Sequence, residues 1–155
     1  KVHSYIAGKT RIHKENEKKS QSFFTKGTFL PFKDAEGIYL INNAGMLSPV
    51  GPIEKLAAED LELHMKVNLL APMRTSSAFI RNLESFTGRK VIATVASGAG
   101  VRPYYGWSAY SSGKAGLIMN TRVIGEEQKE RTYPVIAYTI APGLIAIVSH
   151  NGLND

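Results

Sequence analysis

The chain has 155 residues, of which 43% are hydrophobic and 21% charged, with a net charge of +6 and no cysteine. This length suits one domain and is too short for two well-packed domains. The absence of cysteine excludes a disulfide framework, a cysteine-ligated zinc site and a thiol nucleophile, and we expect no metal site. Because the apolar runs are far shorter than a membrane span and no signal-peptide pattern opens the chain, we expect a cytoplasmic protein without a membrane partner.

The positive charge is concentrated near the start of the chain. Residues 1–37 hold eight basic and four acidic side chains. A basic segment can attract nucleic acid. However, Lys14–Lys19 mixes basic and acidic residues, as a solvated helix face does, and no nucleic-acid-binding module or basic–aromatic stripe accompanies it. We therefore expect no nucleic-acid partner.

The hydrophobic pattern predicts alternating strands and helices. Val2–Ile6 is a weaker candidate strand, and Ile38–Ile41 is a buried strand that ends in the loop Asn42-Asn43-Ala44-Gly45. A long helix follows from Ala58 to Leu83, in which Pro72 should cause a kink or leave backbone groups unpaired. The remaining elements are a strand at Lys90–Val95 before Ser97-Gly98-Ala99-Gly100, a helix from Ser108 to about Glu130, and a strand at Val135–Ile140 before Pro142-Gly143.

This alternation predicts an α/β fold with right-handed βαβ units. We expect a three-layer, doubly wound parallel sheet of the Rossmann type, with helices on both faces. In such sheets a ligand binds outside the carboxyl ends of the strands. Asn43, Ser97 and Gly143 follow those ends, so the functional site is predicted there.

Tyr110 and Lys114 are the first candidates for a chemical role. They stand four residues apart on a predicted helix, so their side chains share one face. A neighbouring ammonium favours the phenolate form of a tyrosine, which suits general acid–base chemistry at a carbonyl or an alcohol. Taken alone, this spacing more often marks a tyrosine that packs beside a surface lysine.

Two further residues support the chemical interpretation. Ser97 lies thirteen residues before Tyr110 at a strand end, where its hydroxyl could meet the same substrate oxygen. Asn68 lies in the apolar stripe of the preceding helix, close to Pro72. A buried asparagine needs hydrogen-bond partners and could hold a water or a backbone carbonyl. A satisfied core amide is the equal alternative for Asn68.

Five motifs in this order resemble the short-chain dehydrogenase/reductase family. They are Asn42-Asn43-Ala44-Gly45, Val67-Asn68, Val95-Ala96-Ser97-Gly98, Tyr110-Ser-Ser-Gly-Lys114 and Ala141-Pro142-Gly143. Within the family, Gly106-Trp107-Ser108-Ala109-Tyr110 and Ser97-Gly98-Ala99-Gly100 are most similar to the sepiapterin reductase and benzil reductase branch. The resemblance extends from about Gly37 to Gly143.

The resemblance implies a catalytic tetrad. Tyr110 would transfer the proton, and Lys114 would assist it while bonding the nicotinamide ribose. Ser97 would hold the substrate carbonyl, and Asn68 would bind a water that links Lys114 to solvent. Tyr104 and Trp107 would favour an aromatic substrate, although simple packing explains these two aromatic residues equally well.

The resemblance also implies a nicotinamide cofactor. Asn43, Ala44 and Gly45 would line its adenosine side, and Pro142, Gly143 and Ile145 would approach the nicotinamide. The first 37 residues depart from the family pattern, because only Gly8 survives of the glycine-rich turn that receives the pyrophosphate. There is no room before Gly37 for the family's second and third strands, and Ile147 stands where the family usually has a threonine. We therefore interpret residues 1–155 as one Rossmann-like domain that is apparently incomplete, with a degenerate or incomplete part at residues 1–37.

The leading hypothesis is a reductase that transfers hydride from NADPH to a small-molecule carbonyl, either sepiapterin-like or an aromatic diketone. NADP is favoured over NAD by the branch resemblance alone. The family resemblance also implies a homo-oligomer, a dimer or a tetramer, formed through the helices that carry Asn68 and Tyr110. The alternative is a non-catalytic, reductase-like fragment that acts as an interaction or structural module, which the damaged glycine turn would favour.

Overall fold

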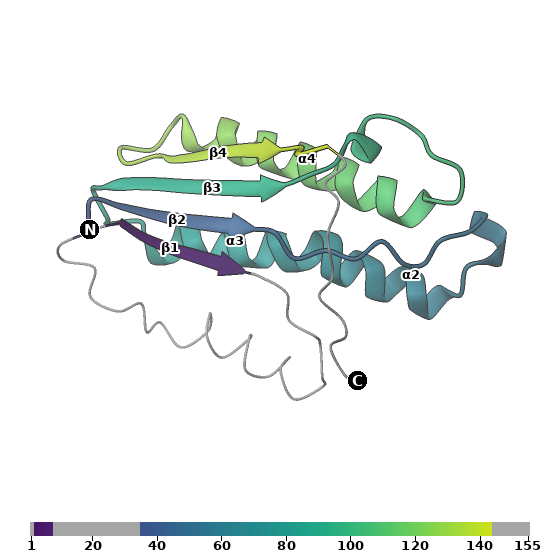
Figure 1. Cartoon of the computed structure of the whole chain (residues 1–155). Coiled ribbons are helices and arrows are strands. Elements are labelled where there is room, and N and C mark those ends of the chain that lie inside the picture. Colours follow the sequence, from purple (N-terminus) through teal and green to yellow (C-terminus); the bar gives the residue numbers. More distant parts are fainter. Residues whose placement is uncertain (1, 8–34, 144–155) are drawn as a thin grey trace, which may run out of the picture.

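The structure, a computed structural model, describes residues 2–7 and 35–143. Its strands form one parallel sheet in the order β1-β2-β3-β4, as Figure 1 shows. The strands are β1 (Val2–Ala7), β2 (Gly37–Asn42), β3 (Arg89–Val95) and β4 (Val135–Ile140). The register pairs Leu40 of β2 with Ile92 of β3 and Ile92 with Ala137 of β4. The parallel arrangement predicted from the sequence is confirmed, including the weaker strand at the start of the chain.

Between β2 and β4 the helices are α2 (Ala58–Met65), α3 (Ala71–Asn82) and α4 (Ser108–Gln128). A π-helical turn, η2 (Lys66–Leu70), joins α2 to α3, and single 3-10 turns occur at η1 (Ile53–Lys55) and η3 (Gly98–Gly100). Among the described residues, none of the helices combines the length and the apolar character that crossing a membrane requires.

The π turn agrees with the disruption predicted at Pro72. Within it, the backbone N–H of Ala71 donates to Lys66 O, five residues back instead of four. Pro72 has no N–H, so it cannot donate to Asn68 O as an ordinary helical residue would. One residue therefore loosens the backbone of the long helix at the turn that carries Asn68.

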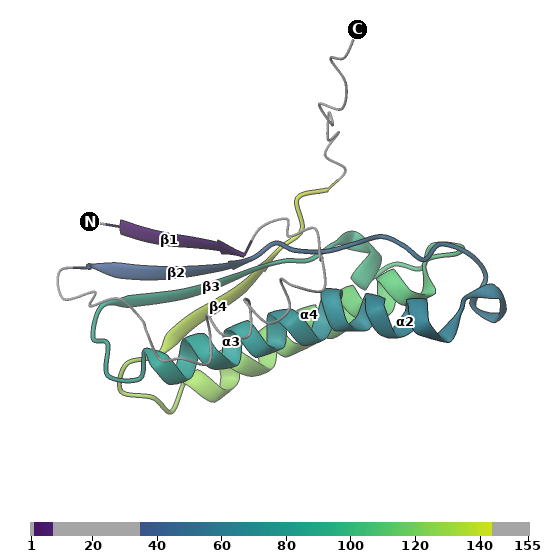
Figure 2. The same ribbon diagram turned by 90° about the horizontal axis from the view of Figure 1, so that it is seen from below.

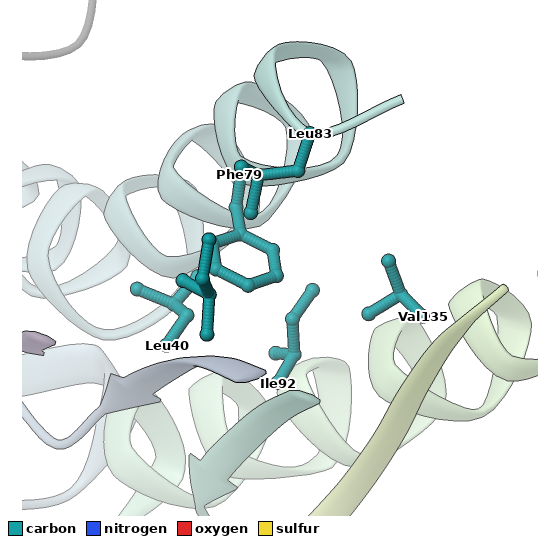
Figure 3. Close-up of a cluster of buried hydrophobic side chains, with 6 residues drawn as sticks. Leu40, Phe79, Leu83, Ile92 and Val135 are labelled. Atoms are coloured by element: carbon teal, nitrogen blue, oxygen red, sulfur yellow. The ribbon is translucent and has the colours of Figure 1, made fainter. Parts of the chain in front are cut away.

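The core lies between the sheet and the helices. Ile38 and Leu40 from β2, Ile92 from β3 and Val135 from β4 meet Phe79 and Leu83 from α3, and all six are at most 4% exposed. Figure 3 shows the ring of Phe79 directed at this cluster. Each of these side chains contributes about 1.5–3 kcal/mol by leaving water, so the cluster holds α3 against the sheet.

The three long helical segments lie on one face of the sheet, as Figure 2 shows. From β2 to β4 the chain steps across the sheet in one direction, and right-handed crossovers then place every helix on the same side. The second helical layer expected from the sequence is not found among residues 2–7 and 35–143. The parallel Rossmann-like fold is confirmed, and it is a partial one.

Candidate active site

The site forms where β2 and β3 end and α4 begins. Asn42 and Thr94 are register partners near the ends of these two strands. Lys114 Nζ donates a hydrogen bond of 2.8 Å to Val95 O, the last carbonyl of β3. The side chain of Lys114 therefore connects α4 directly to the strand that delivers Ser97.

Lys114 and Tyr110 share the inner face of α4. The Lys114 ammonium lies 5.6 Å from the centre of the Tyr110 ring. The Lys114 residue is 4% exposed, and desolvation by this burial lowers its pKa from the ordinary value of 10.5. A lysine ammonium has three N–H donors, so two remain after the bond to Val95 O for other partners.

Asn68 is fully buried and holds the loop that follows β2. Its Oδ1 accepts the Met46 N–H at 2.8 Å, and its Nδ2 donates to Met46 O at 2.7 Å. A Cβ added to Gly45 would lie 3.3 Å from Asn68 Oδ1 and 3.5 Å from Lys114 Nζ. Asn68, Gly45 and Lys114 therefore lie close together, and the water-mediated link between Asn68 and Lys114 stays a prediction.

Ser97 has the extended backbone of a residue that leaves a strand, with φ −154° and ψ 154°. Its Oγ accepts the Ala99 N–H at 3.2 Å and so starts the turn η3. The hydroxyl proton of Ser97 is still available to donate. Direct reach between the hydroxyls of Ser97 and Tyr110 stays a prediction.

An aromatic row runs from the loop before α4 to the inside of the site. Tyr104 and Trp107 have ring centres 5.0 Å apart, and Trp107 meets Tyr110 edge to face at 5.6 Å. The loop is held in place because Gly51 N–H donates to Gly106 O at 2.8 Å, where Gly106 has a φ of +78°. The two predicted substrate-binding aromatics thus lie in the row that ends at Tyr110.

The described cofactor candidates lie at the carboxyl ends of the strands. Asn43, Gly45, Pro142 and Gly143 are exposed, Ala44 is half-buried, and the open backbone of residues 43–45 lies beside Lys114. The space next to Gly45 would be reduced by any side chain there. The roles of these candidates, residues 43–45 on the adenosine side and Pro142 and Gly143 beside the nicotinamide, stay predictions. Gly8 and Ile145, the other predicted cofactor residues, lie outside the described residues, as does Ile147.

Sequence reasoning assigned no role to two buried polar residues near the site, Asn42 and His64. Asn42 Nδ2 donates to Ser76 Oγ at 3.0 Å, and Asn42 Oδ1 accepts the Thr75 hydroxyl at 2.7 Å, so the end of β2 is tied to α3. His64 lies one helical turn before Asn68. That spacing was readable from the sequence, whereas its partners were not. Within the described part of the chain, no group of three His, Asp or Glu residues is placed to hold a metal ion.

Comparison with known proteins identifies the family. Residues 38–154 match the short chain dehydrogenase family. A benzil reductase ((S)-benzoin forming) of Bacillus subtilis (strain 168) is 39% identical over 129 residues, which cover 83% of this chain and 53% of that protein. A sepiapterin reductase of Xenopus laevis is 30% identical over 112 residues, 70% of this chain and 41% of that protein.

Solved structures agree with this assignment. A short-chain dehydrogenase/reductase from Burkholderia vietnamiensis superposes with a TM-score of 0.72 at 25% identity, covering 86% of this chain and 60% of that one. The chain spans about half the length of the curated relatives it matches. The family match covers most of the chain and includes Asn68, Ser97, Tyr110 and Lys114. The chain therefore belongs to the short chain dehydrogenase family of oxidoreductases.

Proposed function

We propose that this chain carries the reaction centre of an NADPH-dependent reductase that converts an aromatic diketone, such as benzil, to a hydroxyketone. The observation that carries the proposal is the position of Lys114, whose ammonium lies beside the Tyr110 ring and Gly45 and donates to Val95 O. This places a fixed cation next to a phenol at the ligand-binding edge of a parallel sheet.

In the proposed reaction, the Ser97 and Tyr110 hydroxyls donate to one carbonyl oxygen of the substrate. Negative charge develops on that oxygen, and fixed donors stabilise it there. The Tyr110 proton then moves to the oxygen to give the alcohol, while the Lys114 ammonium faces the phenolate that forms. The reduced nicotinamide, when bound, supplies the hydride that the carbonyl carbon takes up. Lys114 would also bond the nicotinamide ribose when the cofactor is bound, and would so orient the cofactor as well as Tyr110.

The substrate class is supported by two independent features. The rings of Tyr104 and Trp107 lead to Tyr110 and offer aromatic faces for stacking. Two benzil reductases ((S)-benzoin forming), from Bacillus subtilis and Bacillus cereus, are 39% and 40% identical to this chain over their matched regions. A sepiapterin-like substrate is the second candidate, supported by the Xenopus relative.

The experiment measures binding and turnover separately on the purified chain. Thermal-shift titrations with NADPH and NADH test cofactor binding, and loss of NADPH absorbance with benzil or sepiapterin tests reduction. We expect a larger shift with NADPH and turnover of benzil that the Tyr110→Phe variant lacks. No shift with either cofactor, together with no turnover, would favour the alternative of a reductase-like module without activity.

A further inference from the structure

His64 is a fully buried side chain that the proposed reaction does not use. It lies in α2, and none of its surface is exposed. Both ring nitrogens have partners, since Nδ1 lies 2.7 Å from Ser48 O and Nε2 lies 2.6 Å from Asn68 Nδ2. His64 therefore connects the loop after β2 to the π turn that carries Asn68.

The backbone of Met46 decides which way the Asn68 amide points. Its N–H needs an acceptor and meets Oδ1, while its C=O needs a donor and meets Nδ2. A flipped amide would place donor against donor and acceptor against acceptor, so one orientation alone satisfies both contacts. Asn68 Nδ2 also lies 2.6 Å from His64 Nε2 and 3.5 Å from Nδ1, distances that place it over the face of the imidazole, where an amide N–H meets the π electrons of the ring.

The partner of Nδ1 assigns the ring proton. Ser48 O can only accept, so His64 Nδ1 must carry the proton that it donates. The hydrogen bonds thus run in one direction, from the Asn68 amide to the imidazole and from the imidazole to the Ser48 carbonyl. The donor over the ring face favours the neutral imidazole, and the Ser48 carbonyl places its proton on Nδ1.

His64 also lies against the helix that carries Tyr110. The two rings meet edge to face, with centres 6.2 Å apart and planes at 79°. Gly113 permits this approach, because a Cβ there would lie 3.5 Å from His64 Nε2 and 3.3 Å from Asn68 Cβ. One imidazole therefore contacts the Asn68 amide, the Tyr110 ring and the loop next to Gly45.

We propose that His64 is a positioning residue for the reduction, held as the neutral Nδ1–H tautomer, which fixes the Asn68 turn and the ring of Tyr110 relative to each other. The expected effect of His64 on kcat rests on the proposed function, whereas its tautomer does not. His64 touches no reacting atom. Replacing His64 would remove one contact of the Asn68 amide and the edge-to-face contact that holds the Tyr110 ring.

The first test reads the tautomer and does not depend on activity. Histidine labelled with nitrogen-15 is incorporated into the full chain, and the two ring nitrogens are distinguished by long-range proton–nitrogen correlation at neutral pH. The His64→Gln variant identifies which signals belong to His64. We expect the proton on Nδ1. A proton on Nε2, or on both nitrogens, would overturn the inference.

The second test measures the reaction with NADPH and benzil. His64→Phe should lower kcat roughly tenfold, because small displacements of a positioned group are costly, while the KM for NADPH changes by less than about twofold. His64→Gln should recover part of kcat, since its amide oxygen can accept from Asn68. Phe79→Leu, in the core near the far end of α3, is the matched control for destabilisation and should keep the parental kcat.

The outcomes separate the two proposals. Parental kcat in a folded His64→Phe variant would overturn the positioning role, and His64→Leu supplies the same comparison if His64→Phe does not fold. If the parent chain shows no turnover, the proposed function fails, and the tautomer alone decides the inference about His64.

Discussion

Tyr110 is surrounded by groups that suit a proton donor. The Lys114 ammonium lies 5.6 Å from its ring centre, and Trp107 and His64 meet the ring edge to face. These contacts hold the ring, and in the proposed reaction the hydroxyl is the group that meets the substrate. The proposed role of Tyr110 as proton donor therefore depends on its phenolic oxygen.

We expect Tyr110→Phe to abolish reduction almost completely, by at least about a hundredfold in kcat, because the variant loses the proton donor and keeps the ring. The affinity for NADPH should stay close to that of the parent, since Lys114 and the loop at residues 43–45 are unchanged. Steady-state kinetics and a thermal-shift titration measure the two quantities. Equal kcat values for variant and parent would contradict the mechanism.

Lys114 carries a cost in stability as well as a proposed role. Burial lowers its pKa from 10.5 in the folded state, so the unfolded chain binds a proton more readily. The folded chain is most stable above pH 10.5, where Lys114 is neutral in both the folded and the unfolded state. This stability is lost as the pH falls through the lower pKa of the folded state, because the buried side chain then takes up a proton. At neutral pH the folded chain bears the cost of a desolvated ammonium.

The prediction compares the parent with Lys114→Met, so that contributions from all other groups cancel. The free energy of unfolding of the parent minus that of the variant should rise with pH through the alkaline range up to 10.5. Urea denaturation at a series of pH values measures this difference. A difference that does not change with pH would show that Lys114 is not desolvated in the folded chain.

At the scale of the elements, the two glycines of the turn η3 differ in how closely other atoms approach them. A Cβ added to Gly100 would lie 2.7 Å from Ile118 Cδ1 and 2.9 Å from the backbone carbon of Lys114, whereas nothing lies within 4 Å of one added to Gly98. Gly100 therefore permits the close approach of η3 to α4. That approach holds the end of β3, and Ser97 with it, beside the helix of Tyr110.

We expect Gly100→Ala to destabilise the fold by about 1–3 kcal/mol, because the contact includes backbone that cannot move aside. It should also lower turnover by displacing Ser97. Gly98→Ala is the matched control in the same turn and should change the free energy of unfolding by less than about 0.5 kcal/mol. Denaturant titration of both variants makes the comparison. Equal effects would show that the packing of η3 against α4 does not govern the site.

For the molecule as a whole, the apolar surface is unevenly covered. In parallel sheets helices ordinarily cover both faces, and the described residues supply one of these layers. On β4, Ile136, Tyr138 and Ile140 point away from the helices and are 43–53% exposed. On the helical side, α3 and α4 leave a groove of about 690 Å³ between them, with Met73 and Ile124 among its lining residues.

The helix surfaces support the proposed homo-oligomer. Met119 and Val123, one turn apart on α4, are 57% and 45% exposed, and Leu70 at the end of η2 and Met73 in α3 are 42% and 39% exposed. Because burying such side chains against a second copy removes apolar area from water, we expect a dimer or a tetramer at micromolar concentration.

Met119→Glu should weaken that association at least tenfold, roughly the effect of placing an unpaired charge in a contact, while Met119→Leu should leave it intact. Light scattering over a concentration series measures the mass of each variant. A parent chain that remains monomeric would exclude the oligomer, and association of both variants as strong as that of the parent would place the contact elsewhere.

The sequence by itself determined the elements that depend on local geometry. Apolar runs that end in small or polar loops mark β2, β3 and β4. The spacing of Tyr110 and Lys114 places them on one helix face whatever surrounds them. Pro72 frees the carbonyl of Asn68 because proline lacks an N–H, which is a covalent fact. The sequence alone also showed that these motifs match the short chain dehydrogenase family.

Only the tertiary structure decided which buried groups meet. His64 contacts Ser48, sixteen residues earlier, and Asn42 contacts Ser76, thirty-four residues later. No local pattern encodes such pairs, because they depend on how the crossovers set the helices on the sheet. The same holds for the one helical layer seen among the described residues, since the face that a helix covers follows from the direction in which successive strands are added. A sequence shows which residues must be buried, and the fold decides what they are buried against.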